Sequence, residues 1–193
     1  MKQFLESPDL LHTIVAEAEK NSEEAKRLVA GLSEQQLSWT SAPGSWSIAQ
    51  CLDHLAITSE EFNSYFTDAL ERGRKKWPLA STVPYRPSFM GGWLIKQVVP
   101  ESTRKFPAPK VFRPSQSQAI PGALDKFLDQ QIKFMFYVRQ SRGLDFNKTR
   151  LRSPVTPFMR YSLADAFVVT VVHGWRHLAQ VRRVRETPEF PSN

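Results

Sequence analysis

Residues 162–188 read SLADAFVVTVVHGWRHLAQVRRVRETP, and this segment carries signals for both ends of one long helix. Ser162 and Asp165 have the spacing of a capping box, in which each side chain bonds the backbone N–H of the other residue. Pro188 cannot continue a helix, because it lacks an N–H and its ring clashes with the preceding turn. Apolar residues recur at helical spacing between these signals. The pattern predicts a helix over residues 162–186.

Three further segments show the same helical periodicity of apolar residues. One of them begins with another capping box, Ser47 followed by Gln50, and Gly73 is a natural stop for it. We expect no strands, because no run of alternating β-branched residues is bounded by turn residues. The three further helices are predicted at residues 8–32, 47–73 and 122–142.

The connection between the second and third predicted helices, residues 74–121, contains eight of the fourteen prolines. A segment this long can cross the molecule from end to end, so helices 47–73 and 122–142 are expected to run parallel. Short links join the other neighbours, which favours antiparallel packing there. A short helix is expected at 88–99. The sequence therefore predicts an all-α fold, a four-helix bundle with a long crossover, in one domain spanning 1–193.

The chain has four histidines, and two of them stand four residues apart on the last predicted helix. Four residues advance a helix by roughly 400°, so His173 and His177 emerge about 40° apart and about 6 Å apart along the axis. Two imidazoles at this spacing can hold one ion, and His54 on a facing helix can supply a third ligand. Three neutral nitrogens leave a fourth position for water or substrate. The alternative is a set of hydrogen-bonded core histidines, and spacing alone leaves both interpretations open.

The polar residues nearest these histidines have a functional and a structural interpretation. Gln180 lies one turn after His177, where it could orient an imidazole, contact a substrate or bond within the helices. Cys51 lies one turn before His54, but a lone buried cysteine is more often a small apolar group, so it is not counted as a ligand. His12 is expected in the core or on the surface. The candidate metal ligands are His54, His173 and His177.

The composition of the 193 residues is that of an ordinary globular protein, with 41% hydrophobic and 23% charged residues. A single cysteine excludes an intrachain disulfide and fits a reducing compartment. No apolar segment is long enough to span a membrane and no signal peptide is evident, so we expect a cytoplasmic protein with no membrane partner. The formal charge of +7 comes from scattered cations without a nucleic-acid-binding motif, so nucleic acid is not the expected partner.

Two segments resemble the DinB/YfiT-like superfamily. They are PGSWSIAQCLDHLA at residues 43–56 and HGWRHLAQVRRVRETPEFP at residues 173–191. The matching elements are, in chain order, Trp46, Ser47, His54, His173, His177 and Gln180. The resemblance implies a four-helix bundle with up-down-down-up topology and three histidines that hold a divalent ion. The ligands implied by the resemblance are His54, His173 and His177.

Superfamily members of known activity resemble thiol-dependent enzymes: transferases that conjugate low-molecular-weight thiols, and an isomerase that uses one as a cofactor. The resemblance implies a metal-dependent enzyme with a small-molecule substrate, either a thiol S-transferase or a hydrolase, in which a metal-bound water or thiol reacts. We expect Zn²⁺ or Ni²⁺, because imidazoles suit both. A non-catalytic metal- or ligand-binding stress-response module is the alternative, and nucleic-acid binding through the basic surface is a distant third. The protein is expected to be a monomer or a homodimer.

Charged and aromatic residues are candidates for substrate contacts. A cationic rim formed by residues 72–76, or by Arg150 and Arg152, could help capture acidic thiols. No residue of the sequence stands out as a general base, and a metal-bound water could fill that role. The carboxylates that are candidates for it are Asp125, Asp129 and Glu60. The crossover aromatics expected in pocket walls or core are Trp77, Tyr85, Phe89, Trp93 and Phe112.

Overall fold

A computed structural model describes residues 1–80, 83–102, 107–117, 119–156 and 158–192. The described chain is mostly helical, which confirms the predicted all-α class. Its elements in chain order are α1 (Lys2–Leu5), α2 (Leu10–Val29), α3 (Glu34–Ser38), α4 (Ile48–Lys76), α5 (Phe89–Val98), η1 (Lys110–Phe112), α6 (Ala123–Gln140), β1 (Arg150–Arg152), β2 (Arg160–Ser162) and α7 (Leu163–Arg185). None of the described helices is both long and apolar enough to cross a membrane.

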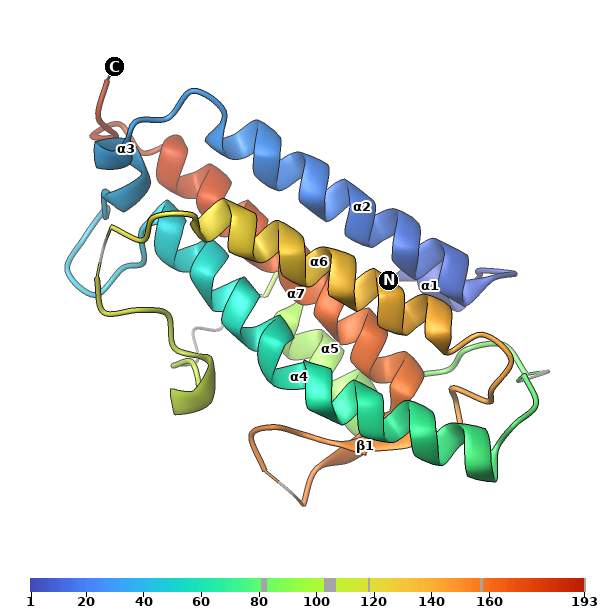
Figure 1. Cartoon of the computed structure of the whole chain (residues 1–193). Coiled ribbons are helices and arrows are strands. Elements are labelled where there is room, and N and C mark those ends of the chain that lie inside the picture. The colour runs from blue at the N-terminus through green and yellow to red at the C-terminus, as the bar shows by residue number, and fades with distance from the viewer. Residues whose placement is uncertain (81–82, 103–106, 118, 157, 193) are drawn as a thin grey trace.

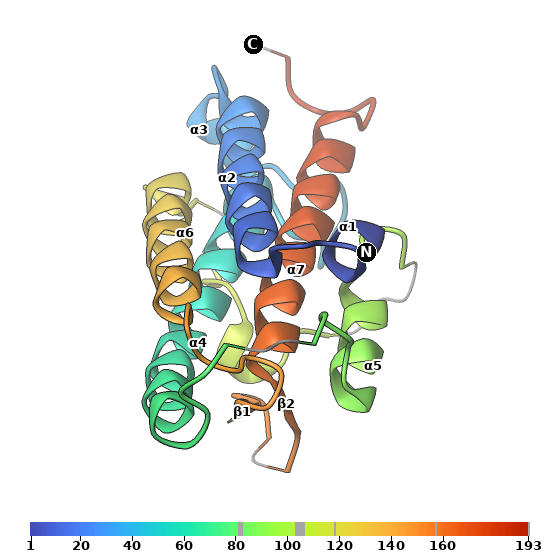
Figure 2. The same ribbon diagram turned by 90° about the vertical axis from the view of Figure 1, so that its right-hand side faces the viewer.

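Helices α2, α4, α6 and α7 are the long ones, and they lie side by side (Figures 1 and 2). Helix α2 packs against α6 and α7, and α4 packs against the same two helices. Their faces meet in an aromatic cluster, in which the ring centroid of Phe66 lies 6.2 Å from that of Phe134 and 5.2 Å from that of Phe167. Because these rings come from α4, α6 and α7, these three helices pack around one aromatic cluster.

The core consists of two apolar clusters that follow each other along the long helices. The aromatic cluster belongs to the first, and the second contains Leu52, Phe127 and Leu178. On α7 the first cluster ends at Val172 and the second begins at Leu178. The segment between these two residues carries the histidine pair, which therefore lies where the two clusters meet.

The starts of α4 and α7 confirm both predicted capping boxes. Ser47 Oγ accepts a hydrogen bond from Gln50 N, and Gln50 Oε1 accepts one from Ser47 N, both at 3.1 Å. Ser162 and Asp165 form the same reciprocal pair, with both distances 3.0 Å. These caps satisfy N–H groups that a helix start otherwise leaves without partners, and they fix where both histidine-bearing helices begin.

Several predicted helix ends differ from the observed ones. Helix α2 begins after Asp9, whose side chain accepts a hydrogen bond from His12 N, and it ends at Val29. Helix α4 continues beyond Gly73, where a stop was predicted. Gly73 is needed there for close packing, since a Cβ at this position would lie 2.8 Å from Thr149 Oγ1.

The expectation that the chain has no strands was wrong. β1 and β2 form an antiparallel pair in which Leu151 is opposite Tyr161. Both of these side chains are 1% exposed and extend the first apolar cluster. Each strand has three residues. That is too short to display the alternation by which strands are recognised in a sequence.

The crossover is tied to the start of α7 by the buried carboxylate of Asp165. This carboxylate accepts hydrogen bonds from Tyr85 Oη at 3.0 Å and from Ser88 N at 3.3 Å, in addition to the capping bond from Ser162 N. Burial and the nearby Asp165 carboxylate raise the pKa of Tyr85, so its hydroxyl remains a donor. Gly91 is packed against the same carboxylate, because a Cβ there would lie 2.1 Å from Asp165 Cγ.

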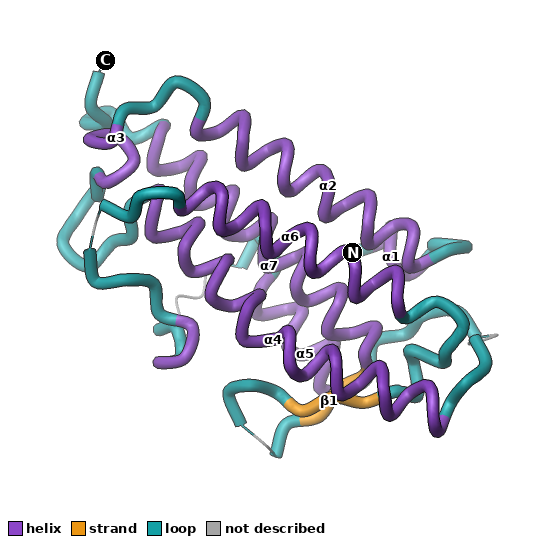
Figure 3. The backbone as a smooth tube through the Cα atoms, in the orientation of Figure 1, coloured by secondary structure: helices purple, strands orange, loops and turns teal. Residues whose placement is uncertain are grey.

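The predicted short helix of the crossover is present as α5, which packs against α7. Two of its aromatic residues are not in a pocket wall or the core, as Phe89 is 92% exposed and Trp93 is 49% exposed. Tyr85 and Phe112 are buried, as expected for core or wall residues. Figure 3 shows that the rest of the described crossover is loop except at η1, which lies beside α4.

Candidate metal centre

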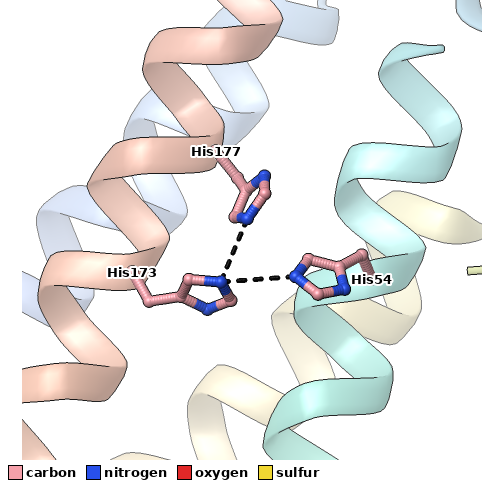
Figure 4. Close-up of side chains that lie close together, drawn as sticks. All are labelled: His54, His173 and His177. Atoms are coloured by element: carbon pink, nitrogen blue, oxygen red, sulfur yellow. Dashed lines mark hydrogen bonds between the residues drawn. The ribbon is translucent and has the colours of Figure 1, made fainter. Parts of the chain in front are cut away.

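Three histidine side chains from two helices lie close together (Figure 4); His54 and His177 are buried, and His173 is half-buried. His54 comes from the second turn of α4, and His173 and His177 come from successive turns of α7. The Nε2 atom of His173 lies 3.3 Å from Nε2 of His54 and 3.0 Å from Nε2 of His177. One ring nitrogen from each residue lies within 4.8 Å of the other two. The structure therefore brings together the three predicted ligands, whereas His12 is exposed on α2.

Two of the three histidines have an outer partner that sets their tautomer. His54 Nδ1 lies 2.5 Å from the carbonyl oxygen of Phe112, which can only accept, so this nitrogen donates its proton. His177 Nδ1 donates to Gln180 Oε1 at 3.0 Å in the same way. Both residues therefore direct an Nε2 lone pair toward His173. Such outer partners orient metal-binding histidines.

The donor set fits a divalent ion better than it fits a hydrogen-bonded trio. Nε2 of His173 faces two lone pairs, and one N–H can be donated fully to only one of them. Two imidazoles that bind one tetrahedral ion at about 2.0–2.1 Å are about 3.3 Å apart, close to the observed spacings. Two of the three pairs match this spacing, and three nitrogens that lie within 4.8 Å of one another could hold a metal ion.

The environment keeps all three imidazoles neutral, which is the form that binds metal. Burial lowers the pKa of His54 from 6.5 to about 4, against the opposing effects of the Phe112 carbonyl and Asp53. Burial also holds the pKa values of His173 and His177 well below 6.5, and the neighbouring imidazoles lower them further. At neutral pH, the site therefore presents uncharged nitrogen donors.

These pKa shifts predict that the metal-free protein loses stability in mild acid. Below pH 6.5 the unfolded chain binds a proton at His54, whereas the folded protein does not until about pH 4, so stability falls as pH falls. His54 alone should cost about 2 kcal/mol of unfolding free energy at pH 5 relative to pH 7. Denaturant titrations of chelator-treated protein at the two pH values measure this loss. His54→Phe should show a smaller loss than the wild type, and equal stability of the wild type at both values would contradict the prediction.

Several other residues surround the cluster. The Trp46 ring centroid lies 4.7 Å from that of His54 and 5.7 Å from that of His177, so the indole covers both rings. Cys51 is fully buried, and burial raises the pKa of its thiol to about 12. It lies outside the cluster of possible ligands found among the described residues.

Asp53 and Arg176, each next to a clustered histidine in sequence, hold the crossover in place. Asp53 Oδ2 accepts a hydrogen bond from Ser115 N at 2.9 Å. Arg176 donates to the backbone carbonyls of Val99 and Ser102.

The predicted cationic rim does not border this site. Arg72 lies 18 residues after His54 on the same helix, which places it about 27 Å away along the axis. Strand β1, which carries Arg150 and Arg152, packs against α4 near that distant end (Figure 1). Of the candidate bases, Asp125 is exposed, and Glu60 and Asp129 line an outer groove rather than the histidine cluster.

Sequence reasoning missed the Phe112 carbonyl as the partner of His54. A backbone carbonyl is present in every residue, so the residue type at position 112 carries no signal for this role. The contact also joins residues 58 positions apart. Gln180, in contrast, could be proposed from its position one helical turn after His177.

Comparisons with known proteins support one assignment. No curated protein and no solved structure matches the chain. The family model of the DinB superfamily matches residues 17–181, a range that contains all three clustered histidines. The match confirms the resemblance noted in the two histidine-bearing segments. The chain belongs to the DinB superfamily.

Proposed function

We propose that this protein is a metal-dependent small-molecule enzyme, a thiol S-transferase or a hydrolase, whose divalent ion, Zn²⁺ or Ni²⁺, is held by His54, His173 and His177. The number of converging donors carries the proposal. Among the described residues the group comprises three side chains, whereas structural zinc sites use four protein ligands. Catalytic sites leave one position for water or substrate. A bound ion would supply the acidity that turns a thiol or a water into a nucleophile at neutral pH.

The chain's own residues would orient the donors and limit their contact with water. The Phe112 carbonyl and the Gln180 amide hold the Nδ1 protons of His54 and His177, so the Nε2 lone pairs stay directed inward. Trp46 packs on both of these rings and shields them from solvent on that side. With these three partners in place, the ligand geometry is set before an ion binds.

A groove beside η1 supports a small-molecule substrate that carries acidic groups. It has a volume of about 860 Å³, within the usual range for small-molecule sites. Its walls come from α4, α6 and the crossover, and η1 also supplies the carbonyl that bonds His54. Its acidic residues are Asp53, Glu60 and Asp129, and its cations are Lys110, Arg113, Lys126 and Lys133. A thiol that bears carboxylates would find more suitable partners here than at residues 72–76.

The fold forms part of the same proposal: the long helices make a four-helix bundle with up-down-down-up topology in one domain. In Figure 1, α2 and α7 run toward the upper left, and α4 and α6 run toward the lower right. The family match over residues 17–181 supports a single domain. Cys51 is a free thiol, which supports a reducing compartment such as the cytoplasm.

One observation favours a non-catalytic metal- or ligand-binding module as the second candidate. The cavity that His173 lines has a volume of only about 20 Å³, which is too small for a substrate molecule. A site of this kind could hold an ion without turning over a substrate.

Titration of the Co²⁺-loaded protein with 2-mercaptoethanol tests the enzyme proposal against this alternative. If a position is open to a thiol, the visible spectrum of Co²⁺ should change and saturate with thiol concentration. The same titration of a Co²⁺-loaded Cys51→Ala variant should give the same change, because Cys51 is not among the donors. A spectrum that does not respond to thiol in either protein would contradict a thiol S-transferase and favour the non-catalytic module.

A further inference from the structure

A small cavity lies between α4, α6 and α7, next to the histidine cluster. Its volume is about 20 Å³. A cavity needs roughly 10–15 Å³ to hold one water molecule, so this one accommodates a single water and nothing larger. Most of its walls are apolar, and the polar residues that line it are Thr58, Ser59, Gln131, Thr170 and His173. A water is stable in such a place only if it has about two to four polar partners.

His173 differs from the other two histidines in its outer partner. The second ring nitrogens of His54 and His177 each bond a protein oxygen. His173 uses Nε2 for both of its contacts within the cluster, and none of the described residues bonds its Nδ1. Figure 4 shows this nitrogen pointing away from His54 and His177. Metal-binding histidines almost always donate this second N–H to a carboxylate, a carbonyl or a water.

Two of the cavity's polar side chains also lack protein partners. Gln131 is 4% exposed, and no hydrogen bond links its carboxamide to another described residue. The buried Oγ1 of Thr58 has no partner among the described residues either. The preceding glutamine behaves differently: Gln130 accepts a hydrogen bond from Asn63 and lines the outer groove. A buried polar group without a partner is costly, so the Thr58 hydroxyl favours an occupant of the cavity, and the Gln131 carboxamide lines the same cavity and can bond that occupant.

We propose that this cavity binds one water molecule, which is the outer partner of His173 Nδ1 and is held by Gln131, with Thr58 beside it. The inference deepens the proposed function, because it assigns Gln131 as a positioning residue for the third ligand. Water suits the role since it can donate or accept. It accepts from Nδ1–H when Nε2 offers its lone pair to an ion, and it donates to Nδ1 when Nε2 carries the proton. The Gln131 carboxamide can form a hydrogen bond with the water in either orientation, because it has both a donor and an acceptor.

The first arm of the test measures Zn²⁺ affinity by competition with a chelator. Gln131→Leu keeps a similar volume but removes the polar partner, and it should weaken Zn²⁺ binding about tenfold or more, as loss of an outer partner does. Gln130→Leu is the matched control, and it should stay within about twofold of the wild type because Gln130 lies in the outer groove. If Gln131→Leu does not fold, Thr58→Val takes its place in the Zn²⁺ affinity measurement, because this change is isosteric and removes no protein hydrogen bond. It should weaken binding as well, and Thr58→Ser should restore it.

The second arm uses the metal-free protein and does not depend on the proposed function. NMR cross-relaxation should show a long-lived water next to the His173 ring and the Gln131 side-chain amide in the wild type and in Gln130→Leu. The water signal should disappear in Gln131→Leu. Wild-type Zn²⁺ affinity in Gln131→Leu together with no water signal at His173 in the wild type would overturn the inference and leave the metal site intact. Absence of Zn²⁺ binding by the wild type would instead overturn the proposed function, and the water signal would still decide the inference.

Discussion

Changing His173 or His177 to alanine is expected to abolish stoichiometric metal binding. Each change removes one of the three converging nitrogens and leaves two donors, which hold an ion poorly. Loss of an outer partner weakens metal binding about 10–100-fold, and loss of a ligand should exceed that range, more than about 100-fold. Metal analysis of the purified variants, with competition titrations for Zn²⁺, measures both effects.

His12→Ala is the matched control for these variants. It removes the same side chain, but His12 is exposed on α2, away from the cluster. Its metal content and Zn²⁺ affinity should equal those of the wild type. Circular dichroism should show that all three variants remain helical, so that lost binding reports on the ligands. Unchanged metal content in both His173→Ala and His177→Ala would contradict the assignment of these residues as ligands.

The second large effect is expected for Asp165→Ala, and it concerns stability. The Asp165 side chain is fully buried and accepts hydrogen bonds from Tyr85, Ser88 and Ser162. Each buried donor left without a partner costs about 1–3 kcal/mol, so the variant should lose about 3 kcal/mol or more of unfolding free energy. Denaturant titrations measure the loss. Asp129→Ala, which removes an exposed carboxylate on α6, should change stability by less than about 0.5 kcal/mol.

A double-mutant cycle makes this prediction more specific. Gly91→Ala in the wild type should also destabilise the protein, because the added Cβ would lie 2.1 Å from Asp165 Cγ. In the Asp165→Ala background the carboxylate is gone, so the second change should cost less, with a coupling of about 1 kcal/mol or more. Additive losses would show that Gly91 and Asp165 do not act on each other. A loss below about 1 kcal/mol for Asp165→Ala alone would show that the carboxylate does not fasten the crossover.

The histidine pair and the contact between Gly91 and Asp165 differ in how far the sequence could predict them. The helix with the histidine pair was predicted from its cap, its apolar spacing and its terminal proline, and both capping boxes are present. The pairing of His173 with His177 follows from the pitch of a helix alone. The role of Gly91 could not be predicted in this way, because the carboxylate it accommodates is 74 residues away in the chain.

The errors in the sequence analysis have more than one physical origin. Gly73 was predicted to end a helix, but its packing against Thr149 keeps it inside α4. The cationic rim was expected to help capture an acidic thiol, but α4 carries residues 72–76 to about 27 Å from His54. Phe89 and Trp93 were expected in the core or a pocket wall, and the way α5 packs leaves them exposed. A contact distant in sequence overrode the local pattern at Gly73, whereas the length of α4 itself separates the rim from the site.

The sequence by itself determined the helical class, the starts of the two histidine-bearing helices and the spacing that puts His173 and His177 on one face. These features arise from interactions within one or two helical turns, so a short segment specifies them. Only the tertiary structure decided that His54 meets the pair, that the Phe112 carbonyl sets its tautomer and that Gln131 faces a cavity beside His173. Those contacts join different helices and the crossover. They exist only once the packing of several long helices outweighs the entropy lost in bringing distant segments together.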